Sequence, residues 1–115
     1  MSRHSMDLIK GTLDVLILKT VSWGPMHGYA ISRWLRETTE DSFQVEEGAL
    51  YPALRRLEKK GWLDSEWGLT DTRRQAKFYR LTDAGRQRLE QEVDLWSRYV
   101  EAMGRVLFHA GPAES

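Results

Sequence analysis

The sequence has 115 residues, with seventeen Lys/Arg against seventeen Asp/Glu and no cysteine. This length predicts one domain with a modest core, and the lack of cysteine excludes disulfides, thiolate chemistry and thiolate metal sites. Residues 1–10 are polar and charged, unlike a signal peptide, and the longest apolar run, Val15–Leu18, is too short to span a bilayer, so we expect a cytoplasmic protein without membrane contact.

A first helix is predicted from about residue 8 to residue 22. Its main apolar stripe is formed by Leu13, Leu16, Ile17 and Val21, and other apolar residues widen this stripe to nearly all sides. A helix that is apolar on most faces is buried on most faces. In so small a domain, we expect a second subunit to cover part of it. The segment Trp23-Gly24-Pro25 ends the helix, since glycine favours the C-cap and proline cannot continue it.

A second helix is predicted from about residue 28 to residue 38. Its apolar side is predicted to hold Tyr29, Ala30, Ile31, Trp34 and Leu35. His27 is expected to order the start of this helix. The polar segment 38–42 is typical of a loop, and residues 43–45 are compatible with a very short strand.

A third helix begins near Gly48 and ends at Gly61, the expected glycine after the C-cap. Its buried face is defined at helical spacing by Leu50, Ala53, Leu54 and Leu57. Pro52 is expected near the helix start, where backbone N–H groups have no intrahelical partners. On a helical projection, the side opposite the buried face holds Gly48, Pro52, Arg55 and Lys59, with Tyr51 and Arg56 flanking them.

A β-hairpin is predicted next, because apolar and polar residues alternate in 62–67 and, more weakly, in 76–81. The connecting loop, residues 68–75, is longer than a tight turn and basic near its end. Between Gly48 and Thr82 there are eight Lys/Arg and four Asp/Glu, whereas the rest of the chain has nine against thirteen. This polarity favours a nucleic-acid partner; the alternative for each basic cluster is an ordinary solvated surface.

The last helix is predicted to start with Thr82 as N-cap and Asp83 at the positive helix end, and to continue to about Phe108. An apolar seam at heptad spacing runs along it: Leu89, Val93, Trp96, Val100, Met103 and Leu107. A helix of about 26 residues is roughly 39 Å long, more than the diameter of roughly 27 Å of a compact domain. We therefore expect it to pair with the same helix of a second copy. The predicted homodimer contacts are this seam together with Leu13, Leu16 and Ile17.

This order of elements predicts a mainly α fold with a small β-hairpin (α+β). Residues 1–81 would form a winged helix-turn-helix domain, 82–108 a dimerisation helix and 109–115 a disordered tail. In such a domain the third helix enters the major groove and the hairpin forms the wing. The predicted DNA-binding residues are Gly48, Tyr51, Pro52, Arg55, Arg56, Arg73, Arg74 and Lys77. Lys59 and Lys60 lie late in the helix, where capping the helix dipole is at least as good an explanation as DNA contact.

Four segments resemble the PadR family of bacterial transcriptional regulators: GTLDVLILKTV (11–21), PMHGYAI (25–31), EEGALYPALRRLEKKGWL (46–63) and RRQAKFYRLTDAGRQRL (73–89). The resemblance covers about residues 8–108. It implies a dimeric winged-helix protein that binds double-stranded operator DNA, usually as a repressor that a small ligand releases. The short C-terminus resembles the subfamily with one dimerisation helix. Ala49 stands where the family often has Thr, and the wing is less continuously basic than is usual.

Trp96 has two interpretations. At a seam position it is most simply an aromatic residue of the dimer core. In small multidrug-sensing members of the family, a Trp at the matching place lines a pore at the dimer interface and stacks on flat aromatic ligands. The resemblance therefore implies that Trp96 is also a candidate effector contact.

Other polar residues give no support to catalysis. His4, His27 and His109 lack metal-ligand spacing, and Glu46 and Glu47 favour the positive start of the third helix rather than forming a catalytic pair. We expect no enzyme activity, metal or other cofactor. The alternative to a DNA-binding repressor is a winged-helix module that binds another protein and no DNA. The overall neutrality of the chain favours this alternative.

Overall fold

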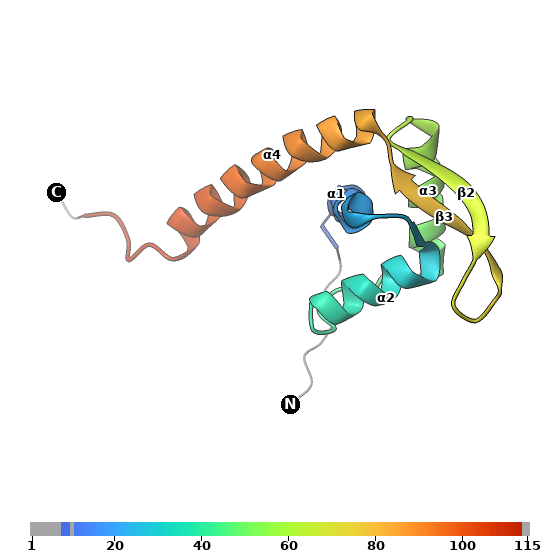
Figure 1. Cartoon of the computed structure of the whole chain (residues 1–115). Helices are drawn as coiled ribbons and strands as arrows, with labels where there is room; N and C mark the ends of the chain where they lie inside the picture. The colour runs from blue at the N-terminus through green and yellow to red at the C-terminus, as the bar shows by residue number, and fades with distance from the viewer. Residues whose placement is uncertain (1–7, 10, 114–115) are drawn as a thin grey trace.

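The computed structural model describes residues 8–9 and 11–113; His4 lies outside them. Its elements follow in the order α1 (Thr12–Thr20), the 3₁₀ turn η1 (Val21–Trp23), β1 (Met26–His27), α2 (Gly28–Thr38), α3 (Glu47–Lys59), β2 (Leu63–Leu69), β3 (Gln75–Leu81) and α4 (Asp83–Leu107). Figure 1 shows α1, α2 and α3 gathered beside the hairpin, while α4 leads away from them. The predicted α+β class, with three helices, a hairpin and a long final helix, is confirmed.

A single core joins the three short helices to the sheet and to the first turns of α4. The largest fully buried side chains include Ile17, Leu18 and Ile31, which meet Leu54 and Leu57 from α3. The helical spacing predicted this buried face of α3, because residues three and four apart lie on one side of a helix. Burial of large aliphatic side chains contributes about 1.5–3 kcal/mol each, so this cluster fixes how α3 sits on the domain.

The sheet differs from the predicted two-stranded hairpin. It has three antiparallel strands in the order β1-β3-β2, because Met26 pairs with Tyr79 and His27 with Phe78. Residues 43–45, predicted as a possible strand, form none. Two residues between a proline and a helix carry no visible alternation, so their pairing depends on the position of β3 in the folded chain.

Helix α3 begins one residue before the predicted start and ends as predicted. Gly61 follows the C-cap with a φ of 79°, the left-handed conformation that glycine adopts most easily. Pro52, however, lies in the second turn rather than the first. Since proline has no N–H, the carbonyl of Gly48 four residues earlier lacks its helical partner. Gly48 is exposed, so water can satisfy this carbonyl.

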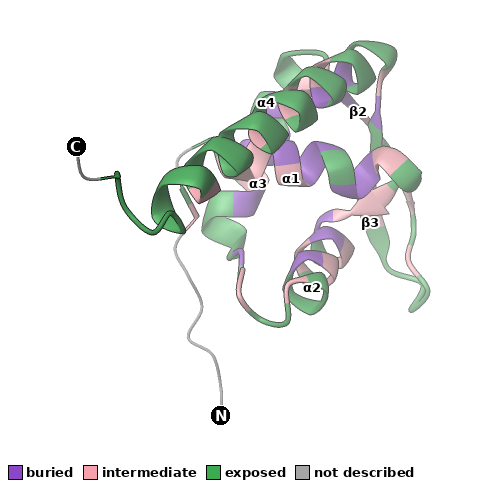
Figure 2. Cartoon of the chain, turned by 90° about the vertical axis from the view of Figure 1, so that its left-hand side faces the viewer, coloured by how far each residue is buried: buried purple, intermediate pink, exposed green. Residues whose placement is uncertain are grey.

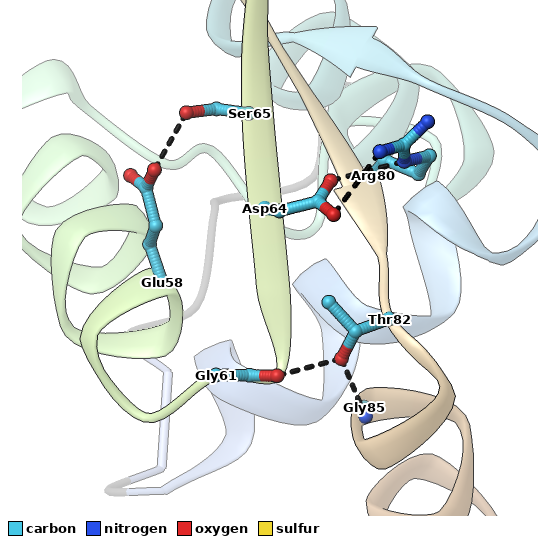
Figure 3. A network of polar contacts seen from close by, with 7 residues as sticks. All are labelled: Glu58, Gly61, Asp64, Ser65, Arg80, Thr82 and Gly85. Carbon is cyan, nitrogen blue, oxygen red and sulfur yellow. Dashed lines mark hydrogen bonds and ion pairs between the residues drawn. The ribbon is translucent and has the colours of Figure 1, made fainter.

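A compact polar joint fixes the direction of α4 (Figure 3). The Thr82 hydroxyl accepts a hydrogen bond from the Gly85 N–H at 3.0 Å, which confirms Thr82 as the N-cap, and donates one to the Gly61 carbonyl at 2.6 Å. The Thr82 N–H also donates to the Trp62 carbonyl at 3.1 Å. The start of α4 is therefore attached directly to the turn that follows α3, so the two helices are mechanically linked.

Beyond its first turns, α4 leaves the domain. The chain measures 66 × 38 × 22 Å with a radius of gyration of 17.0 Å, against roughly 13 Å for a compact domain of about 100 residues. Figure 2 shows the second half of α4 as almost entirely exposed. Several large apolar side chains are exposed there: Val100, Met103, Val106 and Leu107 on the helix and Phe108 directly after it.

Candidate nucleic-acid interface

The outward side of α3 is the first part of the candidate interface. Gly48, Pro52 and Arg55 are exposed, opposite the buried leucines of the same helix. Apart from its chain neighbours and the adjacent backbone of the helix, no described atom lies within 4 Å of the place that a Cβ at position 48 would occupy. Glycine inside a helix costs about 0.5–1 kcal/mol relative to alanine, and packing within the chain gives no reason for it. The result is a low edge on which one arginine projects.

Tyr51 does not lie on this edge as freely as predicted. Its ring packs over Gly28 at the start of α2, where an added Cβ would meet the Tyr51 hydroxyl oxygen at 2.8 Å. The side chain is half-buried and packs against the core. Tyr51 therefore positions α3 against α2, and only part of it is accessible to a ligand outside.

Two of the predicted DNA-binding cations are held by carboxylates of the same chain. Arg56 forms an ion pair with Asp14 of α1. Lys77 of β3 lies 3.4 Å from Glu58 of α3, and Ser65 of β2 donates a 2.6 Å hydrogen bond to the same carboxylate (Figure 3). All four charged side chains of these pairs keep some exposure, and such pairs contribute about 0–1 kcal/mol each. Their geometric effect is to attach α3 to α1 on one side and to the hairpin on the other.

The hairpin presents its remaining predicted cations at its tip. Two hydrogen bonds between Thr70 and Arg74 close the loop. The Thr70 N–H donates to the Arg74 carbonyl at 2.9 Å, and the Thr70 hydroxyl accepts from the Arg74 N–H at 3.1 Å. Arg73 adopts a φ of 62°, a left-handed conformation that is uncommon for residues other than glycine. Arg73 and Arg74 are both exposed, so the tip carries two cations on a closed loop.

Helix α2 adds two residues to the candidate interface, Tyr29 and Arg33, that the sequence analysis did not predict as DNA contacts. Tyr29, predicted on the apolar side of its helix, is 63% exposed. The Arg33 guanidinium lies 5.8 Å from the centre of its ring, and Gly28 beside it touches Tyr51 of α3. In helix-turn-helix proteins the helix before the recognition helix crosses the DNA backbone. The signal was available in the spacing of Tyr29 and Arg33, which lie one helical turn apart.

The apolar residues predicted at a dimer interface fall into two groups. Ile17 has no exposed surface and Leu89 keeps 6%, so both belong to the core of the single chain and have little to offer a partner. Leu13 and Leu16 are half-buried. Four seam residues are at least 43% exposed: Val93, Val100, Met103 and Leu107. The start of the heptad seam, at Leu89, is buried in the core of the single chain, because α4 packs on α1 before it extends away from the domain.

Trp96 lies at the boundary between these groups. It is half-buried, packs edge-on against Tyr99 with ring centres 5.8 Å apart, and lines a cleft of about 440 Å³ between α1, the α3–β2 turn and α4. The predicted effector residue is thus placed at a hollow.

The remaining sequence predictions concern histidine and membranes. The His27 ring nitrogen Nδ1 accepts from the Ala30 N–H at 3.3 Å, which confirms that this residue orders the start of α2. Within the described residues no group of His, Cys, Asp and Glu is arranged to hold a metal ion. Of the helices in residues 8–9 and 11–113, none is long and apolar enough to cross a membrane.

Comparison with known proteins identifies the relatives of this chain. The model of the family described as "Transcriptional regulator PadR-like family" matches residues 17–91, which confirms the resemblance seen in the motifs. A transcriptional regulator from Clostridium thermocellum is similar in structure, with a TM-score of 0.74 and 31% identity, over 93% of this chain and 100% of the other.

A second relative is the negative transcriptional regulator PadR of Bacillus subtilis (strain 168). It is 29% identical over 67% of this chain, and this chain spans 42% of its length. The crystal structure of Bacillus subtilis PadR in complex with operator DNA matches with a TM-score of 0.64 and 27% identity, over 71% of this chain and 47% of the other.

Proposed function

The chain belongs to the PadR-like family of transcriptional regulators, and we propose from this premise that it binds operator DNA as a homodimer and represses transcription. The family consists of regulators and not of enzymes, in agreement with the prediction from the motifs. The observation that carries the proposal is the low, cationic edge of α3, where Gly48, Pro52 and Arg55 are exposed and the space beside Gly48 is open.

The DNA contacts that this edge supports are specific in kind. The first turns of α3 would enter the major groove, with Arg55 placed to donate to a guanine edge or a phosphate. Arg73 and Arg74 at the hairpin tip would contact the phosphate backbone or the minor groove. Arg56 and Lys77, which are paired with carboxylates, would help chiefly by holding α3 and the wing at a fixed angle.

Dimerisation is supported by the exposed seam of α4. Val100 is 62% exposed and Leu107 63%, and Phe108 directly after the helix is 87% exposed. An exposed apolar surface of this kind on a protruding helix favours burial by a partner. Pairing about a two-fold axis would present two α3 helices to half-sites about one helical turn apart. The Thr82 joint would transmit the arrangement of the α4 helices to the α3 helices.

The proposal of repression is supported by a relative, and the proposal that a ligand relieves it is supported by the surroundings of Trp96. The name of the Bacillus subtilis relative supports a negative sign of regulation. A small planar aromatic effector would enter the cleft beside Trp96 and Tyr99. Trp96→Ala should then abolish most of the ligand-dependent change in tryptophan emission, and unaltered quenching in that variant would place the ligand elsewhere.

A band-shift titration with the DNA upstream of the protein's own gene tests the proposal. Two subunits with roughly 3–5 phosphate contacts each should give a slope of log affinity against log salt of about −5 to −9. Arg55→Ala should weaken binding by about 1–3 kcal/mol if Arg55 reads a base. Arg98→Ala, an exposed arginine on α4, is the matched control and should bind normally. A flat salt response, or no shift at all, would favour a module that binds protein.

A further inference from the structure

Glu58 places a carboxylate beside a cation of the candidate interface. It follows Arg55 by three positions on α3, so the two side chains are neighbours one helical turn apart. The Glu58 side chain reaches toward the hairpin and is 31% exposed, and Arg55 is exposed as well. A carboxylate at this position repels a phosphate that approaches Arg55, so its charge opposes the DNA binding proposed for this side of α3.

Each oxygen of this carboxylate has a partner on the hairpin. Oε2 accepts a 2.6 Å hydrogen bond from the Ser65 hydroxyl of β2 (Figure 3), and Oε1 lies 3.4 Å from the Lys77 ammonium of β3. The two donors lie on the same face of the sheet, because Ser65 is paired with Tyr79, two residues from Lys77. Together they form a small anion-binding arrangement, and Glu58 occupies the place of the anion.

This arrangement is open to an anion from outside. Lys77 keeps 37% of its side-chain surface exposed, and Trp67, its partner across the two strands, is 66% exposed. The Lys77 ammonium also lies 5.8 Å from the centre of the Tyr79 ring, which is buried. Lys77 therefore projects from a packed base at the junction between α3 and the hairpin, where a phosphate can reach it.

The contact between Lys77 and Glu58 is weak enough to be exchanged. Its length of 3.4 Å exceeds the roughly 2.7–2.9 Å of a good charge-assisted hydrogen bond, and both side chains are partly exposed, so water screens the pair. A DNA phosphate offers Lys77 an equivalent acceptor. Glu58 competes with that phosphate in two ways, because it occupies the lysine and because its own charge repels the phosphate.

We propose that Glu58 limits the affinity of this protein for DNA phosphates, by holding Lys77 and by occupying the place between α3 and the hairpin that a phosphate would take. The inference rests on the proposed DNA-binding function and adds a residue that sets its strength. Phosphate contacts supply essentially all of non-specific binding, whereas base contacts specify sequence. By reducing the phosphate contacts, Glu58 makes binding depend more on the base contacts of α3.

Band shifts over a series of salt concentrations test the inference with Glu58→Gln. This variant removes the charge but keeps an amide oxygen that can accept from Ser65. Two DNAs of equal length are compared, the DNA upstream of the protein's own gene and an unrelated sequence. If one lysine in each subunit of a dimer is released to a phosphate, the slope of log affinity against log salt should steepen by about 2.

The affinity of Glu58→Gln for both DNAs should rise at least about fivefold at low salt, because a phosphate contact carries no sequence information. An unchanged slope, or weaker binding, would overturn the proposal and leave Glu58 only the task of holding the wing in place. A gain confined to the upstream DNA would also overturn it, since Glu58 would then act on base recognition.

Two further variants make the test specific to Lys77. Glu66 follows Ser65 in β2, so its exposed side chain lies on the opposite face. Glu66→Gln changes the net charge by the same amount and should keep the slope of the unmodified protein. In the double variant Glu58→Gln/Lys77→Gln the gain should disappear, because the released lysine is absent. A gain that survives without Lys77, or that Glu66→Gln reproduces, would trace to net charge alone and refute the assignment.

Elution from a heparin column separates this inference from the proposed function, because the sulfates of heparin are anions and no operator is needed. Glu58→Gln should elute at a higher salt concentration than both the unmodified protein and Glu66→Gln. A later elution without any shift of the upstream DNA would refute operator binding and support the role of Glu58. Normal band shifts with equal slopes and equal elution would refute the role of Glu58 alone.

Discussion

Replacing Gly85 by alanine should destabilise the fold more than the same change at any other glycine of this chain, because Gly85 lies where α4 packs tightly against the turn after α3. A Cβ at position 85 would lie 2.0 Å from the Trp62 carbonyl oxygen and 2.8 Å from a methyl carbon of Leu81. The Trp62 carbonyl and the α4 backbone are main-chain groups, so a change of side-chain rotamer cannot relieve this clash. Gly85→Ala therefore requires the start of α4 to move away by about 1 Å or more to restore ordinary contact distances.

The cost follows from the contacts that such a movement loosens. Thr82 would lose part of its N-cap bond to the Gly85 N–H and of its bonds to Gly61 and Trp62. A cap contributes about 1 kcal/mol, and each further hydrogen bond about 0.5–1.5 kcal/mol. Alanine returns up to about 1 kcal/mol of helix propensity. Because these bonds are weakened rather than all lost, we expect a net loss of about 1–3 kcal/mol in the free energy of unfolding, the usual range for overpacking.

Thermal and urea unfolding at one protein concentration measure this loss. The midpoint temperature of Gly85→Ala should fall by roughly 10 °C for a chain of this size. Gly104→Ala in the same helix is the control, since its Cβ would meet only the Phe108 ring at 3.7 Å; its stability should be unchanged or up to about 1 kcal/mol higher. If Gly85→Ala unfolded within 0.5 kcal/mol of the unmodified protein (roughly the scatter of surface substitutions), the argument about the joint would be refuted.

Three further substitutions have expected outcomes. Gly48→Ala should stabilise the fold by about 0.5–1 kcal/mol yet weaken DNA binding in a band shift, and unchanged DNA affinity would show that nothing approaches this edge closely. Gly28→Ala should cost about 1–3 kcal/mol by pushing on the Tyr51 ring, and its coupling to Tyr51→Ala in a double-mutant cycle should be at least about 0.5 kcal/mol. Burial raises the pKa of the Tyr79 phenol above its usual 10.0, against the opposing charge of Lys77. The folded state thus holds this proton more tightly, so stability is full below pH 10 and falls as the pH rises through the folded-state pKa. Tyr79→Phe should flatten that alkaline fall in urea unfolding measured between pH 8 and 11.

The division of the chain into residues 1–81, 82–108 and 109–115 stays a prediction. The contacts of Gly85 and Leu89 with the core show how closely the second part is joined to the first. If the α4 seam forms the dimer, stability and DNA binding should respond together to changes at the joint.

The sequence by itself determined the elements whose signal is local and periodic. The spacing of Leu50, Ala53, Leu54 and Leu57 predicted the buried face of α3, and the caps at Gly61 and Thr82 predicted where α3 ends and α4 begins. Such signals are legible because residues three or four apart share a helix face and because capping acts on the nearest backbone groups. The same logic identified the apolar seam of α4, four of whose six residues are exposed.

Only the tertiary structure decided which cations remain available and which side chains meet. Arg56 and Asp14 are 42 residues apart, and Lys77 and Glu58 are 19 apart, so no local pattern announces that they pair. The two-residue strand β1 likewise exists only because β3 passes beside it. Ile17 and Leu89 belong to the core rather than to a partner because α4 packs on α1 at its start. Contacts between distant segments depend on the packed arrangement of the whole chain, and periodicity within one segment does not contain that arrangement.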